Sequence, residues 1–373
     1  MTLQQIAVPF LVAAGFAALA TPLVSRFAIA FDIVDRPNER KVSDRAGMPL
    51  FGGGAVFAGV LAGLAVAAWL GAFEGVDAAK IAGFLVGGVL LLGVGLWDDR
   101  FDLSAWQKLP FQIVAAVVAI ACGYEIDFFT NPFTATTSAL PDFIAWPVTL
   151  LWIVAVTNAM NLIDGLDGLS AGLGMIIAGT LAVICVQAGQ PAGVLLGAIT
   201  CGALLGYLPF NFPPAKIFLG DAGALFIGFS LALLSIQGYR KAALLTFVVP
   251  LLALAVPLLD VALSIQRRLR SGRGVFTADK MHMHHVLLAR EGSHRKAVLW
   301  LYFQTACFSI IAVSFAQLKG WSAWVFLAAV GLLTFRLLRN LGLLAAPGDG
   351  LPADAGQEPE PAAALRKVKE ESS

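Results

Sequence analysis

Charged residues are scarce in this chain. They make up 13% of its 373 residues, whereas 58% of the residues are hydrophobic. A soluble globular chain carries about 25% charged residues, and no soluble fold can hide this much apolar surface in one core. The composition therefore predicts that the lipid bilayer is the solvent for most of the chain.

Cysteine is also rare, and Cys122, Cys185, Cys201 and Cys307 all lie inside apolar runs. None of them forms a C-x-x-C pair, so we expect neither a disulfide scaffold nor a zinc site. The formal net charge is +1, which excludes a basic nucleic-acid-binding protein on bulk charge. No charged n-region precedes the first apolar run, so this run is predicted to be a retained span and not a cleaved signal.

Long apolar runs are abundant. A helix that crosses the bilayer needs roughly 20 mostly apolar residues. About eleven segments qualify, at 6–25, 51–72, 80–97, 110–124, 142–159, 169–188, 192–210, 222–238, 241–265, 298–317 and 320–339. Pro250 and Pro257 fall inside the ninth segment and are expected to kink or break it. We expect an all-α polytopic membrane domain over residues 1–345, followed by a disordered cytoplasmic tail over residues 346–373.

The distribution of Lys and Arg predicts the orientation of the spans. With the N-terminus outside, all but four of the 25 lysines and arginines fall in inner loops or in the C-terminal tail. The exceptions are Lys80, Arg240, Lys241 and Lys319, of which the adjacent pair in a very short outer loop fits least well. An odd number of spans then places the C-terminus in the cytoplasm.

Polar residues that could take part in catalysis or binding lie at the ends of these spans. Ionisable residues at membrane depth are costly, so they mark functional sites unless they have structural partners. On the predicted topology, every one of the following lies on the cytoplasmic side: Asp98, Asp99, Asn158, Asn161, Asp164, Asp167, Lys216, Asp221, Asp260, His282, His284, His285 and His294. We therefore expect an active site on the cytoplasmic face of the membrane.

Two motifs offer oxygen ligands. The adjacent Asp98 and Asp99 could bind Mg²⁺, act through its water shell or accept a proton; solvated acids at a helix end are the alternative. Asn161 and Asp164 are spaced i, i+3, so one helical turn would aim both at one point. The glycines of this N-x-x-N-x-x-D-G-L-D-G-L segment would let the backbone approach a phosphate closely, and a polar turn is the alternative.

The next two motifs suit anionic ligands. Lys216 offers a compact cation for phosphate, and Asp221 near a helix N-terminus is either a metal ligand or a cap. A cluster that includes Arg267 and Arg268 precedes an H-x-H-H run. Beside arginines, we interpret these histidines as diphosphate or nucleotide contacts, with a metal site or a structural loop as alternatives.

A basic run ahead of the second span includes Lys41 and is followed by Gly52-Gly53-Gly54. The basic residues could serve only as a positive-inside anchor. The glycines indicate close approach of backbone or of a lipid head group.

In this order, the five motifs resemble those of the polyprenyl-phosphate N-acetylhexosamine-1-phosphate transferases. They are D-R-P-N-x-R-K with P-x-x-G-G, then D-D-R, N-x-x-N-x-x-D-G-L-D-G-L, P-P-A-K-x-F-x-G-D-x-G, and H-x-H-H. The likeness covers about residues 5–340 and is greatest to the WecA/TagO type, which starts O-antigen, enterobacterial-antigen or teichoic-acid synthesis.

The resemblance implies eleven helices in a bacterial inner membrane and a site that faces the cytoplasm. It implies Mg²⁺-dependent transfer of GlcNAc-1-phosphate from UDP-GlcNAc to undecaprenyl phosphate, with release of UMP and with Mn²⁺ as a substitute ion. Related enzymes can form homodimers, but the sequence shows no interface.

Residue roles carry over from the family by position. Asn161, Asp164 and Asp221 match the Mg²⁺-binding region, and Asp98 and Asp99 match the catalytic pair. Asp167 matches a further acidic position, and we include both Asp164 and Asp167 among the catalytic residues. The substrate contacts are Lys41, Lys216, Arg267, Arg268, His282, His284 and His285.

Two departures from the family put the sugar preference in question. Many members have His where this chain has Ser43 and Ser where it has Ala224.

Two questions of mechanism and class stay open. Asp98 or Asp99 would orient or deprotonate the lipid phosphate in a single displacement, whereas covalent catalysis by an Asp is the alternative. The rival classes are a phospho-MurNAc-pentapeptide transferase of the MraY type and a secondary transporter. A transporter would place polar residues near mid-membrane in repeated halves.

Overall fold

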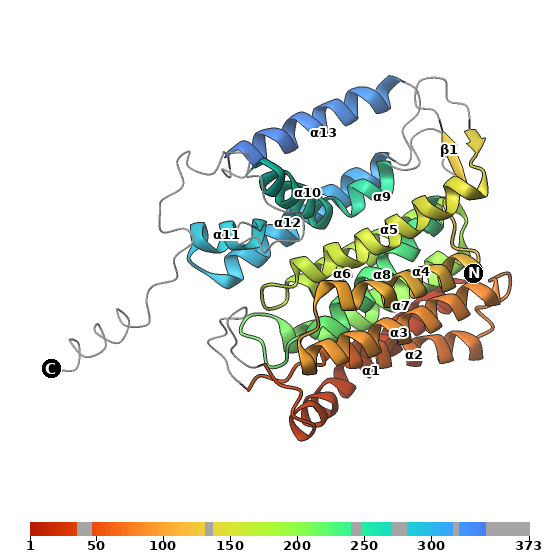
Figure 1. Ribbon diagram of the computed structural model, residues 1–373. Helices are drawn as coiled ribbons and strands as arrows, with labels where there is room; N and C mark the ends of the chain where they lie inside the picture. The colour runs from red at the N-terminus through yellow and green to blue at the C-terminus, as the bar shows by residue number, and fades with distance from the viewer. Residues whose placement is uncertain (36–46, 131–136, 240–247, 271–281, 316–320, 341–373) are drawn as a thin grey trace.

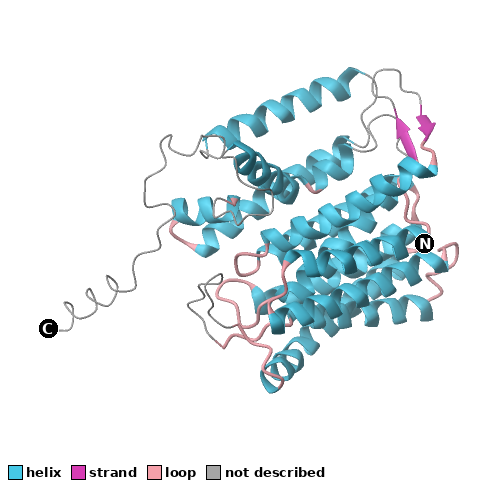
Figure 2. Cartoon of the chain, in the orientation of Figure 1, coloured by secondary structure: helices cyan, strands magenta, loops and turns pink. Residues whose placement is uncertain are grey.

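The computed structural model describes residues 1–35, 47–130, 137–239, 248–270, 282–315 and 321–340. These ranges are helical apart from loops, short bridges and one small β-hairpin (Figure 2). Lys41, Ser43, the pair Arg240–Lys241 and the predicted tail over 346–373 lie outside the described residues.

Thirteen helices are described. They are α1 (Leu3–Ala30), α2 (Gly52–Trp69), α3 (Ala78–Phe101), α4 (Ala105–Ala121), α5 (Asp142–Ile163), α6 (Leu169–Ala188), α7 (Pro191–Asn211), α8 (Gly220–Tyr239), α9 (Val248–Ala253), α10 (Ala255–Arg270), α11 (Met283–Glu291), α12 (His294–Phe315) and α13 (Trp321–Asn340). Within the described ranges, eight helices are long and apolar enough to cross a membrane, and α4 is a shorter apolar helix. The chain is therefore an all-α, multi-pass membrane protein, and the predicted number of eleven spans stays a prediction.

The predicted ninth span is divided into α9 and α10. The break falls at Leu254, between Ala253 and Ala255. Pro257 has no N–H to donate to the carbonyl of Ala253, and its ring crowds that carbonyl. The expectation that proline breaks this span is confirmed.

Helix α8 lies at the centre of the bundle, packed against α2, α3, α5 and α6 (Figure 1). In its candidate span, 94% of the residues are buried inside the protein. Small residues on its neighbours allow this close packing, since a Cβ on Gly87 would overlap the ring of Phe229 and one on Gly174 would crowd Ile227. Glycine and other small residues allow membrane helices to approach each other in the same way.

The helices alternate in direction, so the bundle has two distinct ends. The motif end carries the described loop residues 31–35, 47–51, 101–104, 164–168 and 212–219, where α3, α5 and α7 finish and α2, α4, α6 and α8 begin. The hairpin end carries residues 70–77 and the antiparallel strands β1 (Phe128–Thr130) and β2 (Thr137–Ala139). The two ends lie at opposite sides of the molecule in Figure 1.

Candidate active site

Backbone pairing fixes the start of α8 at the motif end. The amides of Gly52 and Gly53 donate to the carbonyls of Phe218 and Leu219, both at 2.9 Å. A Cβ on Gly53 would overlap the backbone of Gly223. Of the two interpretations of the glycine run, the structure shows close approach of backbone.

Asp99 adds a second anchor from α3. Its two carboxylate oxygens accept the backbone N–H of Asp221 at 2.8 Å and that of Ala222 at 3.2 Å. The first amides of a helix have no partner within the helix, so Asp99 caps α8 from a neighbouring helix. Gly95, one turn earlier on α3, has no side chain because a Cβ there would overlap the backbone of Ala222.

Asp98 faces a different partner. Its Oδ2 lies 2.6 Å from Lys108 Nζ, and the same ammonium lies 3.6 Å from Asp221 Oδ2. Asp98 is buried, and its Oδ1 accepts the amide of Leu103 at 2.6 Å. That amide points back toward Asp98 because Asp102 ends α3 in the left-handed conformation, with φ of 54°.

Local signals place Lys108 and hold it there. Ser104 and Gln107 form a capping box at the start of α4, so Lys108 lies in the first turns of that helix. One turn further on, Gln112 and Asn158 exchange side-chain amide hydrogen bonds of 2.6 and 3.2 Å that tie α4 to α5.

The last turn of α5 completes the group. Asn161 Nδ2 donates to Asp221 Oδ1, and the amide of Asp164 donates to the carbonyl of Asn161 at 3.3 Å. We call Asp98, Lys108, Asn161 and Asp221 the carboxylate centre.

The donor chemistry of this centre suits a hard cation, because carboxylate and amide oxygens are the ligands that Mg²⁺ prefers. Among the described residues, no three His, Cys, Asp or Glu side chains are grouped as ligands of a single ion. A magnesium ion in proteins is commonly held by one or two carboxylates, with substrate phosphates and water as further ligands. The residues therefore fit an ion that binds together with substrate.

Asp167 connects two loops of the motif end. Its Oδ2 accepts the amide of Ala215 at 2.9 Å, and Gly168 next to it donates to Asn211 Oδ1 at 3.1 Å. These bonds fix the loop that carries Lys216, whose own side chain is exposed. In this structure Asp167 thus positions a loop.

The histidine segment surrounds Asp260, which is 1% exposed. Asp260 Oδ1 accepts the amide of Met283 at 2.7 Å, and Oδ2 lies 3.1 Å from His282 Nδ1 and 3.9 Å from His284 Nδ1. The ring of His284 lies against Gly165, where a Cβ would overlap it. The H-x-H-H motif therefore packs on the N-x-x-N-x-x-D-G-L-D-G-L motif.

Burial separates the three predicted histidine contacts. His282 and His284 are buried, whereas His285 is exposed. Burial, with a further contribution from His285, lowers the pKa of His284 to about 3, so its ring is neutral at physiological pH. The structure thus leaves His285 exposed to solvent, pairs His282 with Asp260 and packs the ring of His284 against Gly165.

The other predicted substrate contacts among the described residues are two arginines of α10. Arg267 and Arg268 lie half-buried in the last turn of α10. Ala224, one of the two departures from the family pattern, is fully buried inside α8.

Sequence reasoning missed Lys108 and the structural role of Asp260. From the sequence, Lys108 is only one of the basic residues of a predicted inner loop. The sequence does contain a signal for Lys108. This lysine follows the D-D-R motif closely, so its side chain comes near Asp98 when the chain turns back between the two helices. Asp260 had no local signal, since its partners follow more than 20 residues later.

Comparisons with known proteins agree with the motifs. Residues 81–239 match the model of glycosyl transferase family 4. The chain is 38% identical over 330 residues to a probable undecaprenyl-phosphate N-acetylglucosaminyl 1-phosphate transferase of Bacillus subtilis, covering 88% of this chain and 89% of the relative.

Two further relatives are more distant. A decaprenyl-phosphate N-acetylglucosaminephosphotransferase of Mycobacterium leprae is 36% identical, over 80% of this chain and 81% of its own. An undecaprenyl-phosphate alpha-N-acetylglucosaminyl 1-phosphate transferase of Yersinia pestis is 30% identical, over 81% and 82%. The chain belongs to glycosyl transferase family 4, in its WecA/TagO-like group.

Proposed function

We propose that this protein transfers N-acetylglucosamine-1-phosphate from UDP-GlcNAc to undecaprenyl phosphate or another polyprenyl phosphate. The products are UMP and a polyprenyl-diphosphate-linked sugar. The observation that carries the proposal is the carboxylate centre, which brings Asp98, Lys108, Asn161 and Asp221 together at one end of a membrane bundle. The names of relatives that align with at least four-fifths of the chain support the same reaction.

The reaction joins two anions, so charge is its main obstacle. A phosphate oxygen of the acceptor lipid forms a bond to the β-phosphorus of the donor, and the bond to the bridging oxygen breaks as UMP leaves. A phosphate monoester has a second pKa near 6, so the acceptor needs little help to lose its proton at neutral pH. Residues that orient the phosphates and neutralise charge account for most of the catalysis.

Asn161, Asp164 and Asp221 are the residues that would hold Mg²⁺, or Mn²⁺ in its place, since all offer hard oxygen ligands. When bound, the ion compensates the charge of the diphosphate and of the departing UMP. The adjacency of Asn161 and Asp221 supports this assignment.

The family resemblance makes Asp98 and Asp99 a catalytic pair, and we assign the two residues different roles. Both oxygens of Asp99 accept backbone amides of α8, so we assign it to positioning Asp221. Asp98 is paired with Lys108 and is our candidate for orienting or finally deprotonating the acceptor phosphate. The positive charge of Lys108, Lys216, Arg267 and Arg268, with His285, would attract the two substrates.

The orientation follows from the charge at the two ends. Arg100, Lys108, Lys216 and the arginines of α10 lie at the motif end. Lys80 lies at the hairpin end. By the positive-inside rule, we propose that the motif end faces the cytoplasm of a bacterial inner membrane, with the N-terminus outside and the C-terminus inside.

The test uses purified protein, undecaprenyl phosphate and three radiolabelled donors: UDP-GlcNAc, UDP-GalNAc and UDP-MurNAc-pentapeptide. We expect label in the lipid from UDP-GlcNAc, with an equal amount of UMP released, and loss of both on chelation with EDTA. Label from the pentapeptide donor alone would assign the protein to the MraY-type reaction. Lipid without label from any donor would favour the transporter class.

Inversion or retention at an isotopically chiral β-phosphorus separates the two mechanisms. Net inversion would exclude a covalent intermediate on an Asp, because two displacements retain configuration.

A further inference from the structure

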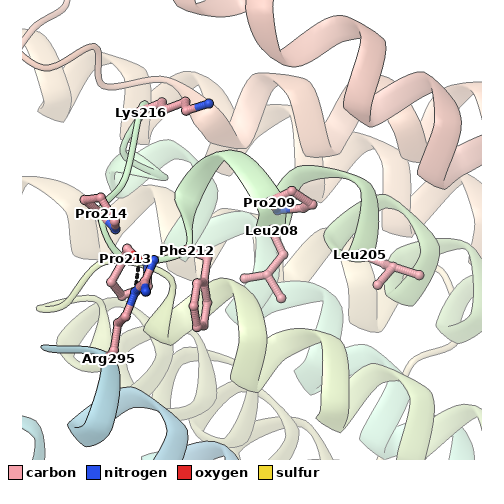
Figure 3. Close-up of a pocket in the computed structure, with 8 residues that line it drawn as sticks. All are labelled: Leu205, Leu208, Pro209, Phe212, Pro213, Pro214, Lys216 and Arg295. Atoms are coloured by element: carbon pink, nitrogen blue, oxygen red, sulfur yellow. Dashed lines mark hydrogen bonds between the residues drawn. The ribbon is translucent and has the colours of Figure 1, made fainter.

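A pocket of about 470 Å³ opens beside the last turns of α7 (Figure 3). Its lining comes from α7, from the loop that follows it and from the start of α12. The residues are Leu205, Leu208, Pro209, Phe212, Pro213, Pro214, Lys216 and Arg295. None of them belongs to the carboxylate centre.

The pocket is apolar along α7. Leu205, Leu208 and Pro209 follow the helix toward its end, and Phe212 continues the row. Leu205 is 43% exposed on a helix that is long and apolar enough to cross a membrane. At a rise of about 1.5 Å per residue, the row from Leu205 to Phe212 is roughly 10 Å long, which matches the first several carbons of an acyl chain.

The polar end of the pocket carries two cations. Arg295 Nε donates to the carbonyl of Pro213 at 2.7 Å, and its guanidinium lies 5.9 Å from the ring centroid of Phe212. This contact holds the guanidinium at the loop end of the apolar row, and Lys216 lines the pocket from the other side of Pro213 and Pro214 (Figure 3). Among the described residues, neither Arg295 nor Lys216 forms an ion pair with a carboxylate.

We propose that this pocket binds an anionic phospholipid, with its phosphate at Arg295 and an acyl chain along α7. The pocket has a cationic end followed by an apolar row, and both parts fit a phospholipid. Basic residues at a membrane surface attract anionic head groups, and an apolar row that faces the bilayer suits a hydrocarbon chain. Bound there, the lipid would brace the loop that Asp167 holds through Ala215 and that leads into Asp221. The bound lipid is a structural ligand and not a reactant.

Native mass spectrometry of the full chain tests the proposal. Protein equilibrated with equal amounts of phosphatidylglycerol and phosphatidylcholine is expected to retain the anionic lipid preferentially. Arg295→Gln removes one cation and is expected to lower this preference about fivefold. Leu205→Trp fills the apolar row and is expected to lower retention of the lipid by a similar factor.

Lys296→Gln is the matched control, because Lys296 is exposed beside Arg295 and does not line the pocket. It is expected to leave the lipid preference unchanged. A thermal unfolding midpoint in detergent, measured for each variant, verifies that the fold is intact.

Two results would overturn the proposal. One is the same phosphatidylglycerol preference in wild type, Arg295→Gln and Leu205→Trp. The other is stoichiometric displacement of the bound phosphatidylglycerol by undecaprenyl phosphate, which would assign the pocket to the acceptor substrate.

Discussion

The same pair of antiparallel helices, α3 and α8, buries polar contacts at both of its ends. At the motif end, Asp98 of α3 and Asp221 of α8 share the ammonium of Lys108. At the hairpin end, Lys80 of α3 donates to Gln237 Oε1 of α8 at 3.3 Å, and its backbone carbonyl accepts the Tyr124 hydroxyl at 3.1 Å. Each end therefore contains a lysine with little exposure.

The partners of Lys80 differ from those of Lys108, and the difference distinguishes a contact that packs helices from one that could serve a function. At Lys80, the ammonium donates to a neutral amide and the backbone carbonyl accepts a hydroxyl. Asp98 and Asp221, in contrast, approach the same ammonium, and like charges in a partly buried site repel unless a cation compensates them. We infer that the motif end is arranged for charged ligands, whereas the hairpin end joins two helices.

The largest expected effect comes from Asp221→Asn. The variant keeps the shape of the side chain but removes its charge beside Asn161 and Lys108, and we expect about a thousandfold loss of turnover. Transfer of radiolabel to lipid measures it. Gln237→Met, at the other end of α8, is the control and is expected to stay within about threefold of wild type. Wild-type activity in Asp221→Asn would remove Asp221 from the metal site.

Replacing each lysine by methionine tests the comparison directly. Lys108→Met leaves two acids without their shared cation, so activity is expected to fall about a hundredfold. Lys80→Met removes a hydrogen bond to an amide and is expected to cost about 1 kcal/mol of stability, with little change in turnover. Equal losses of activity in the two variants would contradict the division between the ends.

Two glycines of α3 test how α8 is positioned. A Cβ at Gly95 would overlap Ala222, whereas Gly93 has open space around it. Gly95→Ala is expected to destabilise the protein by about 1–3 kcal/mol and to lower activity, because it displaces the turn that carries Asp221. Gly93→Ala is expected to match wild type in both assays. An active and stable Gly95→Ala would show that α8 can shift without cost.

The smallest expected effect is a pH dependence of stability from His284. Its folded-state pKa of about 3 lies below the usual value near 6.5. The unfolded chain therefore takes up a proton below pH 6.5 that the folded chain does not, and stability falls as the pH drops. Between pH 7 and 5.5, wild type is expected to lose about 1 kcal/mol more than His284→Gln.

Chemical unfolding in detergent at the two pH values measures this difference. His294→Gln is the control, because His294 is exposed and is not among the groups that lower the pKa of His284, and it is expected to follow wild type. A His284→Gln variant with the same pH dependence as wild type would show that folding does not lower the pKa of His284.

The fold was largely predictable because hydropathy alone marks a membrane helix. The segment 169–188 coincides with α6, and 222–238 lies within α8. The predicted segment 241–265 ends before the helix does, since α10 continues to Arg270. The last residues of α10 are mostly polar, and a hydropathy criterion does not include them.

The site was predictable in its composition and less so in its roles. The structure brings together Asp98, Asn161 and Asp221, as their positions at the same ends of spans indicated. Sequence could not distinguish Asp98 from Asp99, because the difference is a pair of hydrogen bonds to another helix. It could not show the burial of His282 and His284, because their contacts with Asp260 and Gly165 join residues that are distant in the sequence.

Because other helices enclose α8, a change in bilayer thickness does not act on it directly. A helix in contact with lipid tilts or shifts when the bilayer becomes thicker or thinner, but 94% of the span of α8 is buried by other helices. Asp221 at its tip is tied to Asp99 and, through Gly53, to α2. Hydrophobic mismatch therefore acts on α8 indirectly, through its neighbours, and the depth of Asp221 is set by protein contacts.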